Sequence, residues 1–428
     1  MVTGLVCAVC ATTVPISQAL SWKCPRATET DTHHVLHFEN TVEPFRPTDD
    51  ENPYLAFRKY LAVDSFGAAI GLSEDERIRI ITEANAAVAA VAGTGFLRTP
   101  LYRSSELSDA LGFTAEGGVW IKDETHNVAG SHKARHLFTE LLHLLFAEAA
   151  GIAPWTVSTR PPLAIASCGN AAIAASTLAA AVRWPIYVHV PPAATAEVLT
   201  ALTELDADVR VCPRLPDDAA GDPCVLRFRE AVANGAIAFG VQGTENAWCL
   251  DGGRTIGWEM TEDLGHLMDR IFIQVGGGAF AACVGASLRS AGVHPKLHAV
   301  QTEGCAPLAR AWEKAHLTGG ARNAGPRWNE CMWPWETTPV SIADGILDDE
   351  TYDWIGVLDS MADTGGAPVV VSEQHVMQAY EWAHSLTSVN VSATGVAGLA
   401  GLIAMRSDIA NDERVVVVMS GVERVEAN

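Results

Sequence analysis

The feature that most constrains the fold is the regular alternation of short apolar segments with longer helical segments after residue 118. Strands are expected at 119–122, 163–167, 186–190, 208–212 and 237–240, with helices between them at 131–149, 170–182, 195–204 and 223–234. Further strands are expected at 271–275, 297–301 and 415–419. Strands that alternate with helices form βαβ units, in which the strands are parallel. The segment 271–275 is almost wholly apolar, as in strands that helices cover on both faces. The sequence therefore predicts an α/β protein with open, mainly parallel sheets.

Composition narrows the kind of protein. The chain has 428 residues, so two or three domains are expected. Its formal net charge of −22 disfavours nucleic acid as a partner, because the phosphate backbone attracts a basic surface. No apolar run reaches the length of a membrane span, and the first residues lack the basic segment that begins a secretory signal. We expect a cytoplasmic protein with reduced cysteines and no membrane partner.

One strand-to-helix junction carries a candidate nucleophile. The segment 122–135 leaves the expected strand at 119–122, crosses a turn at Gly130 and opens a long helix, which places Lys133 just beyond the carboxyl end of a strand. Open α/β sheets bind their ligands at that end. Lysine occurs only at positions 23, 59, 122, 133, 296 and 314, so few residues could form a Schiff base.

Three further loops follow expected strands. The loop Ser167-Cys168-Gly169-Asn170-Ala171 opens an alanine-rich helix and offers N–H groups to a carboxylate, although serine and asparagine are also ordinary helix caps. The loop Gly276-Gly277-Gly278-Ala279 offers N–H groups to a phosphate, although glycines also permit tight turns. Ser420 ends the last strand, where a serine either bonds a ring nitrogen or caps a turn.

The N-terminal segment contains part of a zinc-ribbon pattern. Cys7, Cys10 and Cys24 have the spacing of three ligands, but Ala27 stands where a fourth cysteine is expected. His33 or His34 could complete the four ligands that structural zinc requires. The alternative is a ribbon that holds no metal.

In this order along the chain, these features resemble the fold type II pyridoxal-phosphate enzymes, the tryptophan synthase β superfamily. The likeness runs from about Thr99 to Gly421 and covers the threonine synthase and threonine dehydratase group. Within that group it is strongest to threonine synthase, because of the cysteine pattern, the Ser-x-Gly-Asn-Ala-Ala loop and the segment 301–308. The resemblance implies two open, twisted, mainly parallel-sheet domains with helices on both faces and the cofactor in the cleft between them. We expect a ribbon-like segment (1–40), a large cofactor-binding domain (41–133 and 245–428) and a small mobile domain (134–244).

The resemblance also implies a role for each loop. Lys133 would hold pyridoxal 5′-phosphate as a Schiff base, Asn170 would contact its phenolic oxygen, and Ser420 would face its pyridine nitrogen. Gly276, Gly277, Gly278 and Ala279 would bind the phosphate. The substrate would contact Ser131, His132, Ser167, Cys168, Gly169 and Ala171. A neutral serine leaves the pyridine nitrogen largely unprotonated, which suits elimination chemistry. His132 departs from the family pattern, because it stands where the group usually has phenylalanine.

The function implied is that of a lyase acting on a β-substituted, β-hydroxy amino acid. The enzyme would abstract the α-proton, eliminate the β-substituent and release ammonia and a 2-oxo acid, as a homodimer that binds a small amino-acid substrate. A synthase that replaces a β- or γ-substituent is the alternative within the group. A non-catalytic relative that binds a metabolite is disfavoured by the intact Lys133. A nucleotide-binding protein is disfavoured because the glycines lack GxGxxG spacing.

Overall fold

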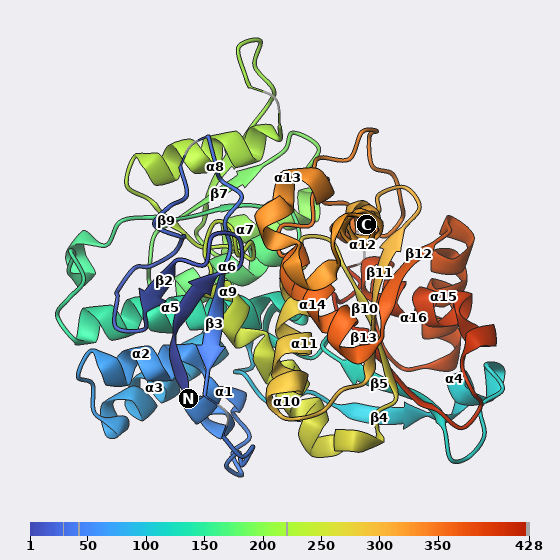
Figure 1. The fold of residues 1–428 in the computed structure, drawn as a ribbon. Coiled ribbons are helices and arrows are strands. Elements are labelled where there is room, and N and C mark those ends of the chain that lie inside the picture. Colours follow the sequence, from blue (N-terminus) through green and yellow to red (C-terminus); the bar gives the residue numbers. More distant parts are fainter. Residues whose placement is uncertain (29, 42, 220, 425–428) are drawn as a thin grey trace.

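Two parallel-rich sheets with their helices form most of the molecule, and a small antiparallel sheet precedes them (Figure 1). The computed structural model describes residues 1–424 apart from residues 29, 42 and 220. The helices in this part of the chain are α1 (Pro53–Ala56), α2 (Ala62–Ala69), α3 (Glu74–Ala92), α4 (Ser105–Ala110), α5 (Lys133–Ala149), α6 (Asn170–Ala181), α7 (Ala196–Glu204), α8 (Pro223–Ala233), α9 (Cys249–Gly252), α10 (Arg254–Asp263), α11 (Ala279–Ser290), α12 (Pro307–Thr318), α13 (Trp328–Cys331), α14 (Trp354–Thr364), α15 (Glu373–Leu386) and α16 (Ala397–Ala404).

The large sheet has six strands in the order β12-β11-β10-β13-β5-β4. They are β4 (Leu101–Ser104), β5 (Gly118–Asp123), β10 (Arg270–Gln274), β11 (Lys296–Thr302), β12 (Ala367–Val371) and β13 (Arg414–Met419). All neighbours are parallel except β4, which pairs antiparallel with β5 at the edge. The run of valines from Val415 to Val418 is buried throughout, because α11 and α14 cover one face of the sheet and α15 and α16 the other (Figure 1).

The second sheet has four parallel strands in the order β8-β7-β6-β9, with bounds β6 (Leu163–Ala166), β7 (Ile186–Val190), β8 (Asp208–Val211) and β9 (Ile237–Ala238). The helices α6, α7 and α8 connect them, so each connection is a βαβ unit. The predicted α/β class with mainly parallel sheets is confirmed. The division into a large and a small mobile domain stays a prediction.

The third sheet belongs to the N-terminal segment and was not expected from the sequence. Its strands are β1 (Val2–Cys7), β2 (Thr13–Pro15) and β3 (Leu36–Asn40), paired antiparallel in the order β2-β1-β3. Its apolar residues Val2, Leu5 and Leu36 join the same core as α3, α5 and α6. None of the helices in the described part of the chain is long and apolar enough to cross a membrane.

Candidate active site

Three of the predicted loops meet at one edge of the large sheet. The strands β10, β13 and β5 are parallel neighbours, so the loops that follow them, which carry Gly276, Ser420 and Lys133, lie side by side. The backbone N–H of Val422 donates to the carbonyl of Gly130 at 2.9 Å, which joins the loop after β13 to the loop after β5. Gly130 has a φ of +73°, and a Cβ there would lie 2.4 Å from Cγ1 of Val422. Only glycine therefore allows the two loops to approach so closely.

Lys133 is the first residue of α5. No hydrogen bond or ion pair to another described residue holds its amine, whereas the amine of Lys122 is bonded to Glu259 and to the carbonyl of Thr99. Burial lowers the pKa of Lys133, although the charges of Asp348 and Asp353 oppose that shift. A larger fraction of the amine is therefore uncharged and nucleophilic than in an exposed lysine.

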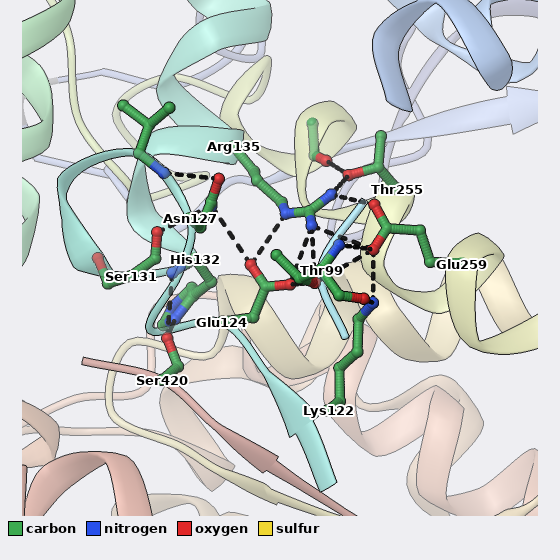
Figure 2. A network of polar contacts seen from close by, with 12 residues as sticks. Thr99, Lys122, Glu124, Asn127, Ser131, His132, Arg135, Thr255, Glu259 and Ser420 are labelled. Carbon is green, nitrogen blue, oxygen red and sulfur yellow. Dashed lines mark hydrogen bonds and ion pairs between the residues drawn. The ribbon is translucent and has the colours of Figure 1, made fainter. Parts of the chain in front are cut away.

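The loop before Lys133 is anchored on a buried network of four charged groups (Figure 2). The guanidinium of Arg135 donates to Glu124 at 2.9 Å and bonds Glu259, which also binds Lys122. Asn127 donates from Nδ2 to the carbonyl of Ser131 at 3.0 Å, which fixes the turn. Although burial opposes it, the charges of Arg135 and Lys122 lower the pKa of Glu259 to about 2. Two cations and two anions thus compensate one another beneath the loop.

The glycine loop follows β10 and ends at the N-terminus of α11. The first N–H groups of that helix have no partner within the helix, so they face any anion bound there. A Cβ at Gly276 would lie 2.3 Å from Oδ2 of Asp348, so the absence of a side chain lets this carboxyl approach the loop. The N–H of Gly277 also contacts Asp348, yet burial raises the pKa of that carboxyl to about 6.

Asp353 lies on the other side of the glycine loop. Its N–H donates to the carbonyl of Gly277 at 2.8 Å, and its Oδ2 accepts from the N–H of Gly243 at 3.1 Å. Its other oxygen, Oδ1, is buried without a hydrogen-bond partner among the described residues. Burial raises the pKa of Asp353 to about 7. The carboxyl is therefore partly protonated at neutral pH and could donate as well as accept a hydrogen bond.

The Ser-Cys-Gly-Asn loop joins β6 to α6. Ser167 accepts at Oγ from the N–H of Gly169 at 3.4 Å, and Cys168 is exposed. No atom lies within 4 Å of the position where a Cβ would stand at Gly169, so the loop faces open space. Nδ2 of Asn170 would lie 3.0 Å from a Cβ at Gly421. The loop after β6 therefore reaches the loop after β13, which contains Ser420.

Arg424 ties this loop to the rest of the site. Its guanidinium donates to Oδ1 of Asn170 and, at 2.9 Å, to the carbonyl of Ala129. These bonds leave Nδ2 of Asn170 as the free end of the amide. Burial lowers the pKa of Arg424, and no carboxylate of the described residues forms an ion pair with it.

The sequence missed three side chains at this site. Asp348, Asp353 and Arg424 all lie more than about 170 positions along the chain from both Lys133 and Asn170, and no local pattern marks them. The one usable signal was the position of Arg424, four residues after Ser420. The predicted residues themselves gather as expected, since the loops that hold Lys133, Asn170, Gly276 and Ser420 adjoin one another. Their individual roles toward a ligand stay predictions.

The N-terminal cysteines also come together. Cys7, Cys10 and Cys24 lie with His34 in one cluster, whose ligand atoms are all within 4.8 Å of one another. Nδ1 of His34 lies 3.3 Å from Sγ of Cys7, and the sulfurs of Cys10 and Cys24 are 3.6 Å apart. His33 instead contacts Asn329 and stacks on Trp328. Of the two histidines considered, His34 thus supplies the fourth group.

Comparison with known proteins identifies the class. Residues 92–421 match the family described as pyridoxal-phosphate dependent enzyme, and the chain belongs to that family. It has the fold of the tryptophan synthase β superfamily, fold type II. A search of curated protein sequences finds no match.

Solved structures share this fold at low sequence identity. Maize serine racemase is 18% identical with a TM-score of 0.61, covering 82% of this chain and 94% of the racemase. Threonine deaminase isoform 2 from Solanum lycopersicum is 18% identical with a TM-score of 0.61, covering 83% of this chain and 87% of the deaminase. A fungal L-serine ammonia-lyase from Rhizomucor miehei is 18% identical with a TM-score of 0.59, covering 76% and 94% respectively.

The site residues fit pyridoxal 5′-phosphate. Lys133 supplies an unpaired amine, and the glycine loop supplies N–H groups that already face one acidic side chain. The free Nδ2 of Asn170 supplies a donor beside Gly421. An amine, an anion-binding loop and an amide donor are the groups that an aldehyde, a phosphate and a phenolic oxygen require.

Proposed function

We propose that the chain is a lyase that acts on a β-hydroxy amino acid and releases ammonia and a 2-oxo acid. The observation that carries the proposal is the amine of Lys133, which forms no hydrogen bond or ion pair with a described residue, at the sheet edge where the glycine loop and the loop after β13 also lie. The bound cofactor supplies an electron sink for a negative charge at the α-carbon of the substrate. The protein's own residues must then bind the substrate carboxylate, hold the α-proton over a base and let the hydroxyl leave.

Lys133 suits the role of the base. Its lowered pKa raises the fraction of uncharged amine above that of an exposed lysine, and an uncharged Nζ can take up the α-proton. Asp348 and Asp353, whose pKa values are raised to about 6 and about 7, then lie near a lysine that has become charged. Their partial ionisation would stabilise that ammonium without binding it permanently.

The loop at the start of α6 suits the substrate carboxylate. Its backbone N–H groups lie at the positive end of a helix of 12 residues, and Gly169 leaves room beside them. Ser167 and Cys168 precede Gly169 in the sequence, and Ser131 and His132 belong to the loop before Lys133. These five positions, with Ala171, are the proposed substrate contacts.

A direct assay of the products tests this function. The purified protein, loaded with pyridoxal 5′-phosphate, is offered L-serine and L-threonine, and ammonia and 2-oxo acid are measured together. Equal amounts of the two products, absent from the Lys133→Ala variant, support the lyase. Conversion to the D-amino acid without ammonia would show a racemase and contradict the proposal, as would no turnover of any β-hydroxy amino acid.

A synthase is the second candidate, because O-ureido-L-serine synthase shares the fold at 16% identity. The same assay separates the two functions if it is repeated with a β-substituted serine and an added nucleophile. A synthase consumes the nucleophile and forms a new amino acid with no 2-oxo acid.

We also propose that the N-terminal cluster binds one zinc ion through Cys7, Cys10, Cys24 and His34. Zinc–sulfur bonds of about 2.3 Å place tetrahedral sulfurs about 3.8 Å apart. The separation of 3.6 Å between the sulfurs of Cys10 and Cys24 fits this geometry. Nε2 of His34 lies 3.3 Å from Asp31, and a carboxylate there would orient the imidazole as metal-binding histidines require.

Metal analysis of the protein purified without chelator tests the zinc site. We expect about one zinc per chain, lost in Cys24→Ser and retained in Cys305→Ser, which changes a buried cysteine outside the cluster. Wild-type protein without stoichiometric metal, or zinc that persists in Cys24→Ser, would contradict the site.

A further inference from the structure

Ser420 does not stand free at the end of β13. Its Oγ accepts a hydrogen bond from the backbone N–H of His132 at 3.0 Å and lies 2.6 Å from Nδ1 of the same residue (Figure 2). His132 therefore contacts the serine through both backbone and imidazole. These two residues are 288 positions apart in the chain, and the pairing of β5 with β13 brings them together.

The imidazole of His132 is held in one orientation. It stacks on Phe280 with ring centroids 3.9 Å apart and an interplanar angle of 14°, and its edge faces His136. Burial, followed by the charge of Lys133, lowers the pKa of His132 well below its usual value. The ring is therefore neutral, so one of its nitrogens carries a proton and the other accepts one.

The short distance favours one direction for this hydrogen bond. Hydrogen bonds from hydroxyl groups are commonly about 2.7–2.8 Å long, whereas those from N–H groups are about 2.9–3.0 Å. The separation of 2.6 Å between Oγ and Nδ1 thus favours Ser420 as the donor and places the imidazole proton on Nε2. The proton of Oγ then points to Nδ1, and one of its two lone pairs accepts from the backbone N–H of His132. Oγ is left with one lone pair, so it can only accept a further hydrogen bond.

We propose that His132 is a positioning residue that turns Ser420 into a hydrogen-bond acceptor toward the pyridine nitrogen of the cofactor. An acceptor there stabilises the protonated ring nitrogen, because only a protonated nitrogen can donate to it. This reverses the expectation that a neutral serine leaves the nitrogen unprotonated, and it strengthens the electron sink. The inference rests on the predicted place of Ser420 beside the ring and deepens the proposed function.

Replacement of His132 by phenylalanine tests the hydrogen bond of the imidazole separately from the packing of the ring. Phenylalanine at position 132 keeps a flat ring against Phe280 and keeps the backbone N–H, but it removes Nδ1. The hydroxyl proton of Ser420 is then free to point at the pyridine nitrogen and favours its unprotonated form. His298→Phe is the matched control, since His298 is also a buried histidine stacked on a phenylalanine, at 4.7 Å from Phe272.

Nitrogen-15 NMR spectroscopy tests the inference in two ways that do not require turnover. In cofactor-free protein labelled at histidine, the signals lost in His132→Phe should show Nε2 protonated and Nδ1 as an acceptor. With ring-labelled pyridoxal 5′-phosphate, the wild type and His298→Phe should show a protonated ring nitrogen, and His132→Phe should lose that signal.

Either of two results would overturn the inference: a proton on Nδ1 of His132, or an unprotonated ring nitrogen in the wild type. An unchanged ring signal in His132→Phe would also overturn it. If that variant fails to hold the cofactor, the two wild-type measurements still decide the question. If both wild-type measurements give the expected result but the protein releases no ammonia, the lyase function is refuted and the role of His132 is not.

Discussion

Two lysines near the end of β5 differ in the partners of their amines, and this difference bears on which amine can react. Lys122 is fully buried and held by Glu259, so its charge is compensated and its amine is occupied. Lys133 is the first residue of α5 and has no such ion pair, and burial lowers its pKa. The sequence singled out Lys133 by its position after a strand, and the difference in partners gives a physical reason for proposing Lys133, and not Lys122, as the nucleophile.

Asp353 makes stability depend on pH. Its pKa is about 7 in the folded protein and near 3.8 in the unfolded chain, so the folded state resists ionisation. The contribution of Asp353 to the free energy of unfolding is largest below pH 3.8, where this carboxyl is protonated in both the folded and the unfolded state. That contribution falls as the pH rises toward 7. Asp353→Asn should therefore stabilise the cofactor-free protein at pH 8, by at most about 4 kcal/mol for about three pKa units.

Thermal unfolding at pH 8 and pH 5 checks this prediction. The gain in Tm should be larger at pH 8, and Asp344→Asn, which changes an exposed carboxylate, should shift Tm little at either pH. A loss of stability in Asp353→Asn at pH 8 would show that the ionised carboxylate is favourable in the fold.

Arg424 should govern how tightly the cofactor is held. Arg424→Gln removes the charged donor that fixes Oδ1 of Asn170, and a hydrogen bond to a charged group contributes about 1.5–3 kcal/mol. Titration with pyridoxal 5′-phosphate should show a Kd about 10-fold to 100-fold higher than in the wild type. Arg214→Gln removes an exposed arginine whose partners are the carbonyls of Ala219 and Gly221, and it should leave the Kd unchanged. If Arg424→Gln and the wild type bound pyridoxal 5′-phosphate equally tightly, the prediction that Arg424 supports cofactor binding would be wrong.

At the scale of elements, one ion network joins β5, α5 and α10. Glu259 on α10 compensates both Lys122 on β5 and Arg135 on α5 (Figure 2). Removing one partner of a buried pair leaves an uncompensated charge, which costs about 3–5 kcal/mol. Glu259→Gln should therefore lower the free energy of unfolding by that amount.

A second glutamate on the same helix provides the matched control. Glu262 pairs with Arg98, and both side chains are 26% exposed, so Glu262→Gln should cost at most about 1 kcal/mol. Urea unfolding at pH 7 measures both variants. Similar losses for the two would mean that the buried network adds no more than a surface pair.

Sequence patterns predicted buried strands better than edge strands and short strands. The buried strands β7, β10 and β13 were found within one residue of their bounds, because apolar residues on both faces mark a strand locally. The edge strand β4 was missed, since Leu101–Ser104 is short and only half-buried. The N-terminal sheet was missed for a similar reason, as its strands are short and joined by loops that contain cysteines and prolines.

At the scale of the whole molecule, the sheet order decides what the sequence could reveal. The strand-to-helix pattern placed each loop at the carboxyl end of its strand, and parallel pairing then made β10, β13 and β5 neighbours. Contacts across that edge, such as His132 with Ser420 and Asn170 with Arg424, join residues 288 and 254 positions apart. No local pattern encodes such pairs, so they became visible only in the assembled fold.

The most direct test of the account is to find which lysine carries the cofactor. The protein is loaded with pyridoxal 5′-phosphate, reduced with borohydride and analysed by peptide mass spectrometry. We predict that the reduced cofactor is attached to Lys133 and that Lys133→Ala carries none. Attachment to Lys122 or to an exposed lysine, or no attachment to the wild type, would contradict the account.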